Sequence, residues 1–220
     1  MRYIHKNPLN KALEKILAEA LKKNIAWDQF KEGRKLLRQH LKDEQFGLCA
    51  YSEISLSEYG FHIEHIKPKS SYNTLRFEHH NLLASAPENQ ADVDKSGLFG
   101  GHKKASNYDE NLFISPTENN CQRYFQYSPN GDIAPNNNLS TADTERAKYT
   151  IECLGLQSSR LLKNKRRKFY EFFHSQIKYL LDQPDILEFY REDYARMNED
   201  GEIKPFQSLV DQILDESSKG

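Results

Sequence analysis

The sequence predicts an α+β protein: a small strand-containing core with catalytic residue types, embedded in a mainly helical scaffold. Apolar residues recur at helical spacing before residue 45 and after residue 140, whereas residues 46–66 and 124–133 show shorter, strand-like alternation. A chain of 220 residues can bury one core with additions. We divide it into an N-terminal helical segment (1–45), a core (46–110) and a hairpin with C-terminal helices (111–220).

The composition is polar, with 29% charged and 37% hydrophobic residues and a mean hydropathy of −0.83. No apolar run approaches the roughly 18 residues that span a bilayer, and the first residues lack the apolar stretch of a signal peptide. Cys49, Cys121 and Cys153 are widely spaced, which indicates free thiols. We therefore expect a cytoplasmic protein without a membrane partner.

Charge is unevenly distributed along the chain. Residues 182–220 hold eleven acids and four Lys or Arg, a balance of −7, so a whole-chain charge of −1 leaves +6 on residues 1–181. The acidic tail is interpreted as a solvated face, or as a segment that shields a basic groove or docks on a basic partner.

The N-terminal segment has the pattern of two amphipathic helices. Asn7-Pro8 supplies a cap and a proline for the first helix, whose apolar face runs from Leu9 to Leu21 and which ends near Asn24. A second apolar run extends from Trp27 to Leu41. Both helices are predicted to be scaffold.

From Phe46 the spacing predicts a short hairpin over residues 46–66 whose second strand delivers Glu64 and His65. Neighbouring strand residues point to opposite faces, so these two can share a site only if the chain bends there, as the following Lys-Pro-Lys indicates. Asn81 then opens a short apolar segment. Residues 87–101 are predicted to be a flexible connection to His102, at the start of a helix over 103–107.

After residue 123 the sequence predicts one hairpin followed by four helices. Alternating aromatics before Asn130-Gly131 predict a second hairpin over 124–133. A capping box at 140–143 and a stop at Gly155 define one helix, and three more are predicted over 158–181, 185–196 and 205–215.

The order Glu64-His65, then Asn81, then His102 is the order of parts in a ββα-metal (HNH) phosphodiesterase site. Cutting a phosphodiester needs a cation for the scissile phosphate, a base for water, and a clamp that orients the base. One carboxylate and one imidazole leave most coordination positions open, which suits Mg²⁺ or Mn²⁺. The alternative is a strand end with a surface ion pair. The nearby His62, His79 and His80 are interpreted as exposed or packing residues, with His62 best placed for phosphate.

Basic residues flank these positions. They either solubilise the surface or contact backbone phosphates; the candidates beside the site are Lys67, Lys69, Lys103 and Lys104. Residues 160–168 hold six basic residues in nine, which indicates a solvated helix face or a phosphate-tracking surface built from Arg160, Lys163, Arg166 and Arg167.

Several blocks resemble a known family in the same order. They are Cys49-Ala-Tyr-Ser, Ile63-Glu-His-Ile-Lys-Pro-Lys-Ser, Asn81-Leu-Leu-Ala-Ser, Gly100-Gly-His-Lys-Lys, the Tyr-Phe-x-Tyr-x-x-x-Gly-x-Ile hairpin and Thr150-Ile-x-x-Leu-Gly-Leu. Over roughly residues 45–173 the chain resembles the HNH nucleases of retron-associated and Septu anti-phage systems, the PtuB-like proteins. The Ile-Glu-His-Ile-x-Pro-Lys block is the most specific piece.

This resemblance implies the residue roles and the partners. His65 would be the general base, Glu64 and His102 the metal ligands, and Asn81 the residue that holds the loop and orients His65. An ABC-type ATPase, PtuA-like, would control the nuclease, and a retron reverse transcriptase with its DNA–RNA product is a further partner. DNA is favoured over RNA as substrate. The competing hypothesis is a catalytically decayed HNH-fold adaptor that binds the ATPase or nucleic acid.

The chain also departs from the family pattern. Many relatives place four cysteines around a structural zinc, and the matching positions here are Cys49, Ser52, Ala86 and Gly100. A lone thiolate does not hold a tetrahedral zinc, so no structural zinc is expected there. Packing must replace the lost metal, and the candidate apolar substitutes are Leu48, Tyr51, Leu82 and Phe99.

Overall fold

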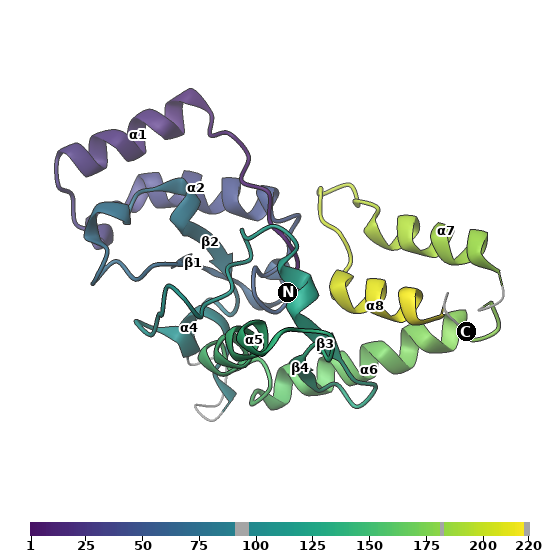
Figure 1. Cartoon of the computed structure of the whole chain (residues 1–220). Coiled ribbons are helices and arrows are strands. Elements are labelled where there is room, and N and C mark those ends of the chain that lie inside the picture. Colours follow the sequence, from purple (N-terminus) through teal and green to yellow (C-terminus); the bar gives the residue numbers. More distant parts are fainter. Residues whose placement is uncertain (91–96, 181–182, 218–220) are drawn as a thin grey trace.

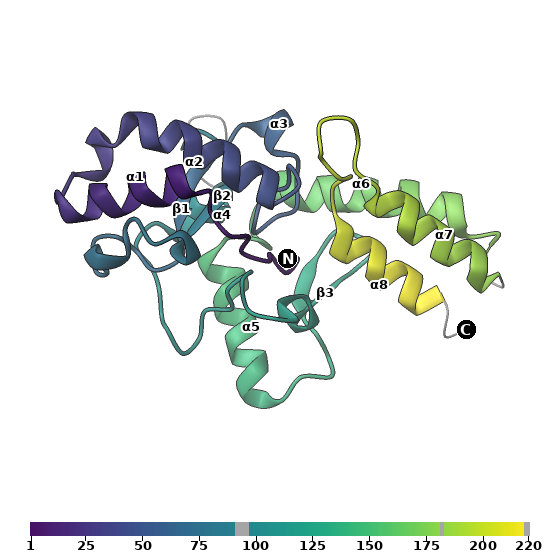
Figure 2. The same ribbon diagram turned by 90° about the horizontal axis from the view of Figure 1, so that it is seen from above.

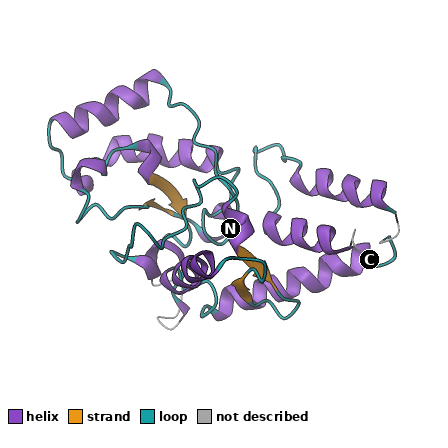
Figure 3. Ribbon diagram, in the orientation of Figure 1, coloured by secondary structure: helices purple, strands orange, loops and turns teal. Residues whose placement is uncertain are grey.

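A computed structural model describes residues 1–90, 97–180 and 183–217 and shows helices around two small sheets (Figures 1 and 3). The helices are α1 (Lys11–Lys22), α2 (Lys31–Glu44), α3 (Leu56–Tyr59), α4 (Gly100–Lys104), α5 (Thr141–Cys153), α6 (Arg160–Ile177), α7 (Pro184–Ala195) and α8 (Gln207–Ser217). The strands are β1 (His62–His65), β2 (Leu82–Ser85), β3 (Phe125–Tyr127) and β4 (Ile133–Pro135). The predicted α+β class is confirmed.

The N-terminal helix begins later than the sequence predicted. Asn10, not Asn7, is its N-cap, and the Asn10 side chain accepts a hydrogen bond from the Leu13 amide. The predicted start at Asn7-Pro8 is wrong because the Asn7 amide donates to Glu44 Oε1 at 2.7 Å and so ties this segment to α2. Helix α1 packs on α2, and α2 packs on both strands of the first sheet.

Strand β1 pairs with β2 in antiparallel register, with Glu64 opposite Leu83 and His65 opposite Leu82. The predicted upstream partner strand is wrong: Leu48 and Ser55 form a single bridge, and Ser55 then caps α3. This turn attaches to the sheet through a hydrogen bond from the Ala50 amide to the Ala84 carbonyl. The fully buried, apolar β2 is therefore the strand that completes the sheet.

Helix α4 completes a β1–β2–α4 unit, with the sheet lying between α2 and α4 (Figure 1). It was expected over 103–107 but spans Gly100–Lys104, so His102 lies at its centre. The shift arises at both ends: the Gly100 amide donates to the Leu154 carbonyl, and Ala105 takes a positive φ of 49° that stops the helix. Residues 91–96 of the predicted connection lie outside the described residues.

The second half follows the predictions closely. Strands β3 and β4 form the expected hairpin, and Ser140 caps α5 by accepting from the Asp143 amide. Helix α8 packs on β3, α6 and α7, away from the first sheet (Figure 2). One apolar cluster nevertheless runs from the N-terminal residues through both sheets to α8. Across the described ranges, none of the helices has the length and apolarity needed to cross a bilayer.

Candidate active site

Glu64 is the only carboxylate lining an open pocket of about 420 Å³ formed by β1, the loop after it and α4, as far as the described residues show. The side chain is 8% exposed, and its Oε1 accepts a hydrogen bond from Lys104 Nζ at 2.8 Å. Burial alone would raise the pKa of Glu64, but His62 and Lys104 outweigh it and hold the pKa below its usual value. The group is therefore an anion at neutral pH, with Oε2 turned away from the lysine and toward His62.

His62 lies beside this carboxylate, with Nε2 3.8 Å from Glu64 Oε2. Its Nδ1 is 2.8 Å from the Pro87 carbonyl, which only accepts, so Nδ1 donates, and Nε2 is the nitrogen that faces Glu64. Sequence analysis placed His62 among exposed or packing residues and missed this pairing. The signal was available, since residues 62 and 64 of a strand lie on the same face.

His102 reaches the pocket from α4 and stacks on His62, with ring centroids 4.0 Å apart. Its Nε2 lies 3.1 Å from the Pro87 carbonyl and 3.2 Å from the Glu88 carbonyl, so this nitrogen donates and Nδ1 is the unprotonated one. Burial, with the neighbouring His62, lowers the pKa of His102. The His62 and His102 rings are thus both oriented by the Pro87 carbonyl, in the way that backbone carbonyls orient metal-bound histidines.

Gly101 allows α4 to approach β1 this closely. A Cβ at this position would lie 2.5 Å from both Glu64 Oε2 and His62 Nε2. A side chain there would occupy the space between the helix and the two candidate ligands.

His65 lines the same pocket at the end of β1. Its Nε2 donates to the Arg76 carbonyl at 3.0 Å, and its ring meets Trp27 edge-on, with centroids 4.5 Å apart. Burial lowers the pKa of His65 to about 4. The ring is therefore neutral at physiological pH, with Nδ1 free to accept a proton.

Asn81 holds the loop that follows β1. Its Oδ1 accepts from the Lys67 amide at 2.7 Å, and its Nδ2 donates to the carbonyls of Lys67 and Leu75 at 3.0 and 3.1 Å. The bond that orients the His65 ring comes instead from Arg76, within the loop that Asn81 closes. Asn81 therefore fixes the loop that carries the Arg76 carbonyl, and this carbonyl orients the His65 ring.

The basic residues around the pocket differ in availability. Lys69 lines the pocket and is exposed. Lys103 is also exposed, on α4, whereas Lys67 is paired with Glu110. Lys104 is 0% exposed and donates to Glu64 and to the His65 carbonyl. The expectation that Lys104 contacts phosphate is therefore corrected: its ammonium neutralises Glu64 inside the protein.

The basic run of α6 is mostly occupied by internal partners. Arg166 is 2% exposed and donates to the Gly131 and Leu156 carbonyls, so its predicted role in phosphate tracking is also corrected. Lys163 pairs with Asp132 at 2.6 Å, and Arg167 pairs with Glu171 at 3.0 Å. Within the described residues, no ion pair is found for the exposed Arg160.

The four positions that hold zinc in relatives lie in the core. The Ala86 amide donates to Cys49 Sγ at 3.3 Å, and a Cβ on Gly100 would meet the Ala86 carbonyl and Tyr51. The predicted apolar substitutes are all buried; they are Leu48, Tyr51, Leu82 and Phe99. Side-chain packing therefore fills this region.

A group of three side chains able to share a metal lies elsewhere. Among the described residues, His40, Glu44 and His79 place one ligand atom each within 4.8 Å of one another. His62, Glu64 and His102 are more loosely arranged, so the pocket is not a closed metal cage.

A β1–β2–α4 unit that gathers a Glu-His pair, a loop-clamping asparagine and a helical histidine defines an HNH-type nuclease core. No family model matches the chain. It is 30% identical over 142 residues to a Vibrio cholerae serotype O1 biovar El Tor protein named "Retron Vc95 putative HNH endonuclease". The match covers 63% of this chain and 66% of that protein, just under two thirds of its length. Over this stretch the chain is therefore similar to a retron-associated HNH endonuclease.

Proposed function

We propose that the chain is a divalent-metal-dependent endonuclease that hydrolyses nucleic-acid phosphodiester bonds in an anti-phage defence system under the control of an ABC-type ATPase. The arrangement of side chains in the pocket supports the metal-dependent hydrolysis in this proposal. Three imidazoles, each with one nitrogen hydrogen-bonded to a backbone carbonyl, line one pocket with a single buried carboxylate.

The donor set fits a divalent cation. Glu64 Oε2 lies 3.8 Å from His62 Nε2, and the bonds to backbone carbonyls leave the second nitrogen of His62 and of His102 available, so Glu64, His62 and His102 are the residues that would hold the ion. We therefore add His62 to Glu64 and His102 as proposed ligands of Mg²⁺ or Mn²⁺. When bound, the cation would neutralise charge on the scissile phosphate and the leaving oxygen.

The protein groups divide the remaining work. His65 takes a proton from water at Nδ1, because its Nε2 is committed to Arg76. Asn81 holds the loop that carries this carbonyl. Lys69 lines the pocket and Lys103 is exposed on α4, and both would contact backbone phosphates. The exposed Arg160 would extend that basic surface.

The defence setting rests on the retron relative and on the family resemblance. A PtuA-like ATPase, and a retron reverse transcriptase with its DNA–RNA product, are the proposed partners, and DNA is the favoured substrate. The decayed-adaptor alternative is not favoured, because a binding module has no use for three histidines held in defined tautomers around a buried carboxylate.

The test is cleavage of plasmid DNA and tRNA by the purified chain, alone and with its ATPase partner, in Mg²⁺ or Mn²⁺ against EDTA. His65→Ala should lower cleavage by roughly 10²–10⁴-fold while folding and nucleic-acid binding persist. The exposed neighbour His80→Ala is the matched control. Full activity of His65→Ala would remove His65 as the base.

Metal titration separates the ligands from the base. Glu64→Ala, His62→Ala and His102→Ala should each raise the Mn²⁺ concentration needed for half-maximal cleavage, whereas His65→Ala should lower the rate at saturating Mn²⁺. An unchanged Mn²⁺ requirement in His62→Ala would contradict its assignment as a ligand.

A further inference from the structure

A second group of metal-type side chains lies on the opposite side of the first sheet from α4. His40 and Glu44 are four residues apart on one face of α2, and His79 approaches them from the turn that precedes β2. The pocket chemistry described above uses none of the three.

The distances suit one shared ion. Glu44 Oε1 lies 3.0 Å from His79 Nε2 and 3.7 Å from His40 Nε2. Ligand atoms about 2.0–2.2 Å from one zinc ion, at angles of roughly 90–120°, are themselves about 3.0–3.7 Å apart. The two imidazole rings meet edge-on, with centroids 5.0 Å apart, so both present Nε2 to the same oxygen.

The nitrogens lack other partners. Neither His40 Nε2 nor His79 Nε2 makes a hydrogen bond of good geometry within the described part of the chain, although both atoms are buried and both lie within ion-pair distance of Glu44 Oε1. His79 is only 8% exposed, and an unsatisfied buried nitrogen costs free energy that a ligand would recover. His79 also lines an open pocket of about 510 Å³, which gives an ion a route from solvent.

We propose that His40, Glu44 and His79 form a second, structural site for a borderline transition-metal ion of the Zn²⁺ class. Two imidazoles and one carboxylate with ligand atoms within 4.8 Å of one another favour such an ion, whereas the more loosely arranged active-site donors leave room for the water and phosphate oxygens that Mg²⁺ or Mn²⁺ requires. The ion links α2 to the turn His79–Asn81, and so stiffens the turn that ends in the loop-clamping Asn81.

Lys6 sets the affinity of this site. Its ammonium contacts Glu44 Oε2 at 2.5 Å and donates to the Leu82 carbonyl at 2.9 Å, with the side chain 4% exposed. Oε1 is directed at the histidines and also accepts from the Asn7 amide at 2.7 Å, and the Lys6 ammonium is already bound to the other oxygen of the same carboxylate. Lys6 therefore weakens binding electrostatically, and its removal should tighten it.

The test uses the full chain with His62→Asn and His102→Asn, which remove the imidazole ligands of the active site. After EDTA treatment and dialysis, Co²⁺ is titrated by its visible absorption and then displaced with Zn²⁺. We expect one equivalent of Co²⁺, at least tenfold weaker binding after His40→Gln or His79→Gln, and about tenfold tighter binding after Lys6→Met. The exposed His80→Gln is the matched control and should bind like its parent. Equal Co²⁺ binding with and without His40 and His79, or no binding at all, overturns the proposal.

Unfolding of the otherwise unaltered chain gives an independent measurement that does not depend on activity. Zn²⁺ should raise Tm because it binds the folded state, and Mg²⁺ should not do so through this site. The Zn²⁺ shift should persist in His102→Asn and vanish in His79→Gln. A shift that follows His102 instead would assign the metal to the active site and end the proposal.

Discussion

His65 shows how burial and one backbone bond prepare a side chain for proton transfer. The ring packs edge-on against Trp27, and its Nε2 donates a hydrogen bond to the Arg76 carbonyl. Because burial disfavours the charged form, the pKa of His65 falls to about 4. The proposed base is thus unprotonated over the whole physiological range, although its intrinsic basicity is reduced.

The first prediction concerns pH. The acid limb of kcat/KM should lie well below 6.5, the ordinary histidine value, because His65 stays neutral until pH approaches about 4. Between these values the unfolded chain binds a proton that the folded chain does not, so the His65 contribution also lowers stability as pH falls from about 6.5 to about 4. A pH–rate profile with denaturant unfolding at each pH checks both, and an acid limb near 6.5 would contradict the role of this ring.

The second prediction uses the close contact at Gly101. Gly101→Ala places a methyl group 2.5 Å from Glu64 Oε2 and His62 Nε2, so the helix or the ligands must move. We expect metal-dependent cleavage to fall at least tenfold, since small displacements of positioned groups are costly. Gly97→Ala, which meets nothing within 4 Å, is the control and should retain activity. Equal activity of the two variants would show that α4 tolerates displacement.

For single residues, the sequence identified the candidate site residues but not the groups that hydrogen-bond to them. Glu64, His65, Asn81 and His102 were singled out, and three of them line one pocket while Asn81 closes its loop. The carbonyls of Arg76 and Pro87 that fix the tautomers have no sequence signature, because any residue supplies a carbonyl. Burial of Lys104 was equally hidden, since a basic residue on a short helix is usually exposed.

Among the elements, the loop between β1 and β2 is held by two side chains. Asn81 makes three hydrogen bonds across it. Arg76 donates from Nη1 to Asn73 inside the loop and from Nη2 to Asn24 Oδ1 at 2.7 Å outside it. The Arg76 carbonyl that orients His65 is therefore fixed by Asn81 together with the side chain of Arg76.

The third prediction follows from this clamp. Asn81→Asp keeps the acceptor for the Lys67 amide but loses both donors, and Asn81→Ala loses all three bonds. We expect Asn81→Ala to lower the free energy of unfolding by roughly 1–3 kcal/mol and to reduce cleavage, with Asn81→Asp intermediate. Denaturant melts and cleavage rates measure this against the exposed Asn111→Ala. Cleavage that is unaffected in Asn81→Ala would remove the loop from the mechanism.

The fourth prediction separates two arginines of α6. Arg166→Met should lower the free energy of unfolding by roughly 2–4 kcal/mol, because two buried carbonyls lose their donor. Arg160→Ala should change stability by less than about 0.5 kcal/mol but weaken nucleic-acid binding and flatten its salt dependence. Melting curves and binding at two salt concentrations distinguish the roles; the reverse pattern would refute them.

The sequence predicted helices that have capping residues, such as α5, but it did not predict that β1 pairs with β2. Ser140 and Gly155 fixed α5 because their chemistry is local. The partner of β1 lies seventeen or more residues away along the chain, and the loop between them contains no hairpin turn to reveal the pairing. The start of α1 was missed because Asn7 bonds to Glu44, a contact visible only in three dimensions.

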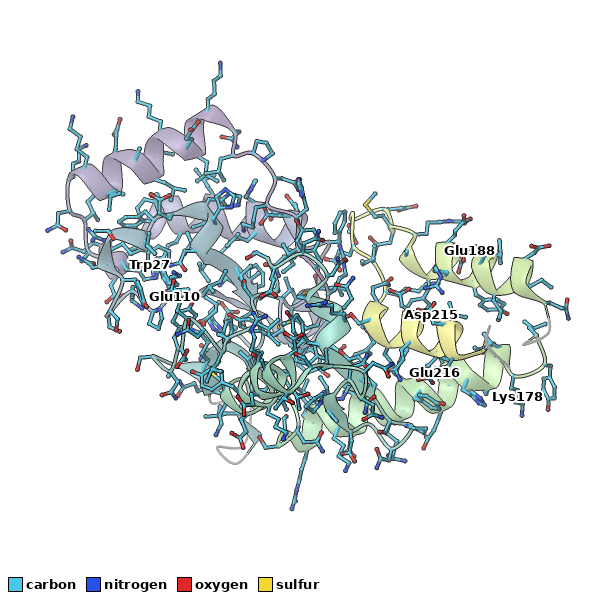
Figure 4. The ribbon with its side chains drawn as sticks, in the orientation of Figure 1. Trp27, Glu110, Lys178, Glu188, Asp215 and Glu216 are labelled. Atoms are coloured by element: carbon cyan, nitrogen blue, oxygen red, sulfur yellow. The ribbon has the colours of Figure 1, made fainter. Side chains whose placement is uncertain are left out.

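At the scale of the whole molecule, α7 and α8 carry a group of acidic side chains. In Figure 4, Glu188, Asp215 and Glu216 lie with these helices on the right, near Lys178, while Trp27 and Glu110 lie on the left. Arg191 of α7 pairs with Asp211 and Asp215 of α8 at 2.6 and 2.7 Å. These ion pairs lie beside the buried Leu187, Leu209 and Val210, so apolar packing and charge pairing both connect the two helices.

The attachment of α4 affects how the β1–β2–α4 unit could be isolated. The Gly100 amide bonds to the Leu154 carbonyl, and a Cβ on Gly155 would lie 2.5 Å from the Leu98 carbonyl and 3.0 Å from Lys103. Helix α4 is therefore anchored by the turn between α5 and α6, about fifty residues downstream. A fragment that stops at residue 110 would keep α4 but lose this anchor, so we expect the unit to need α5 and the turn that follows it.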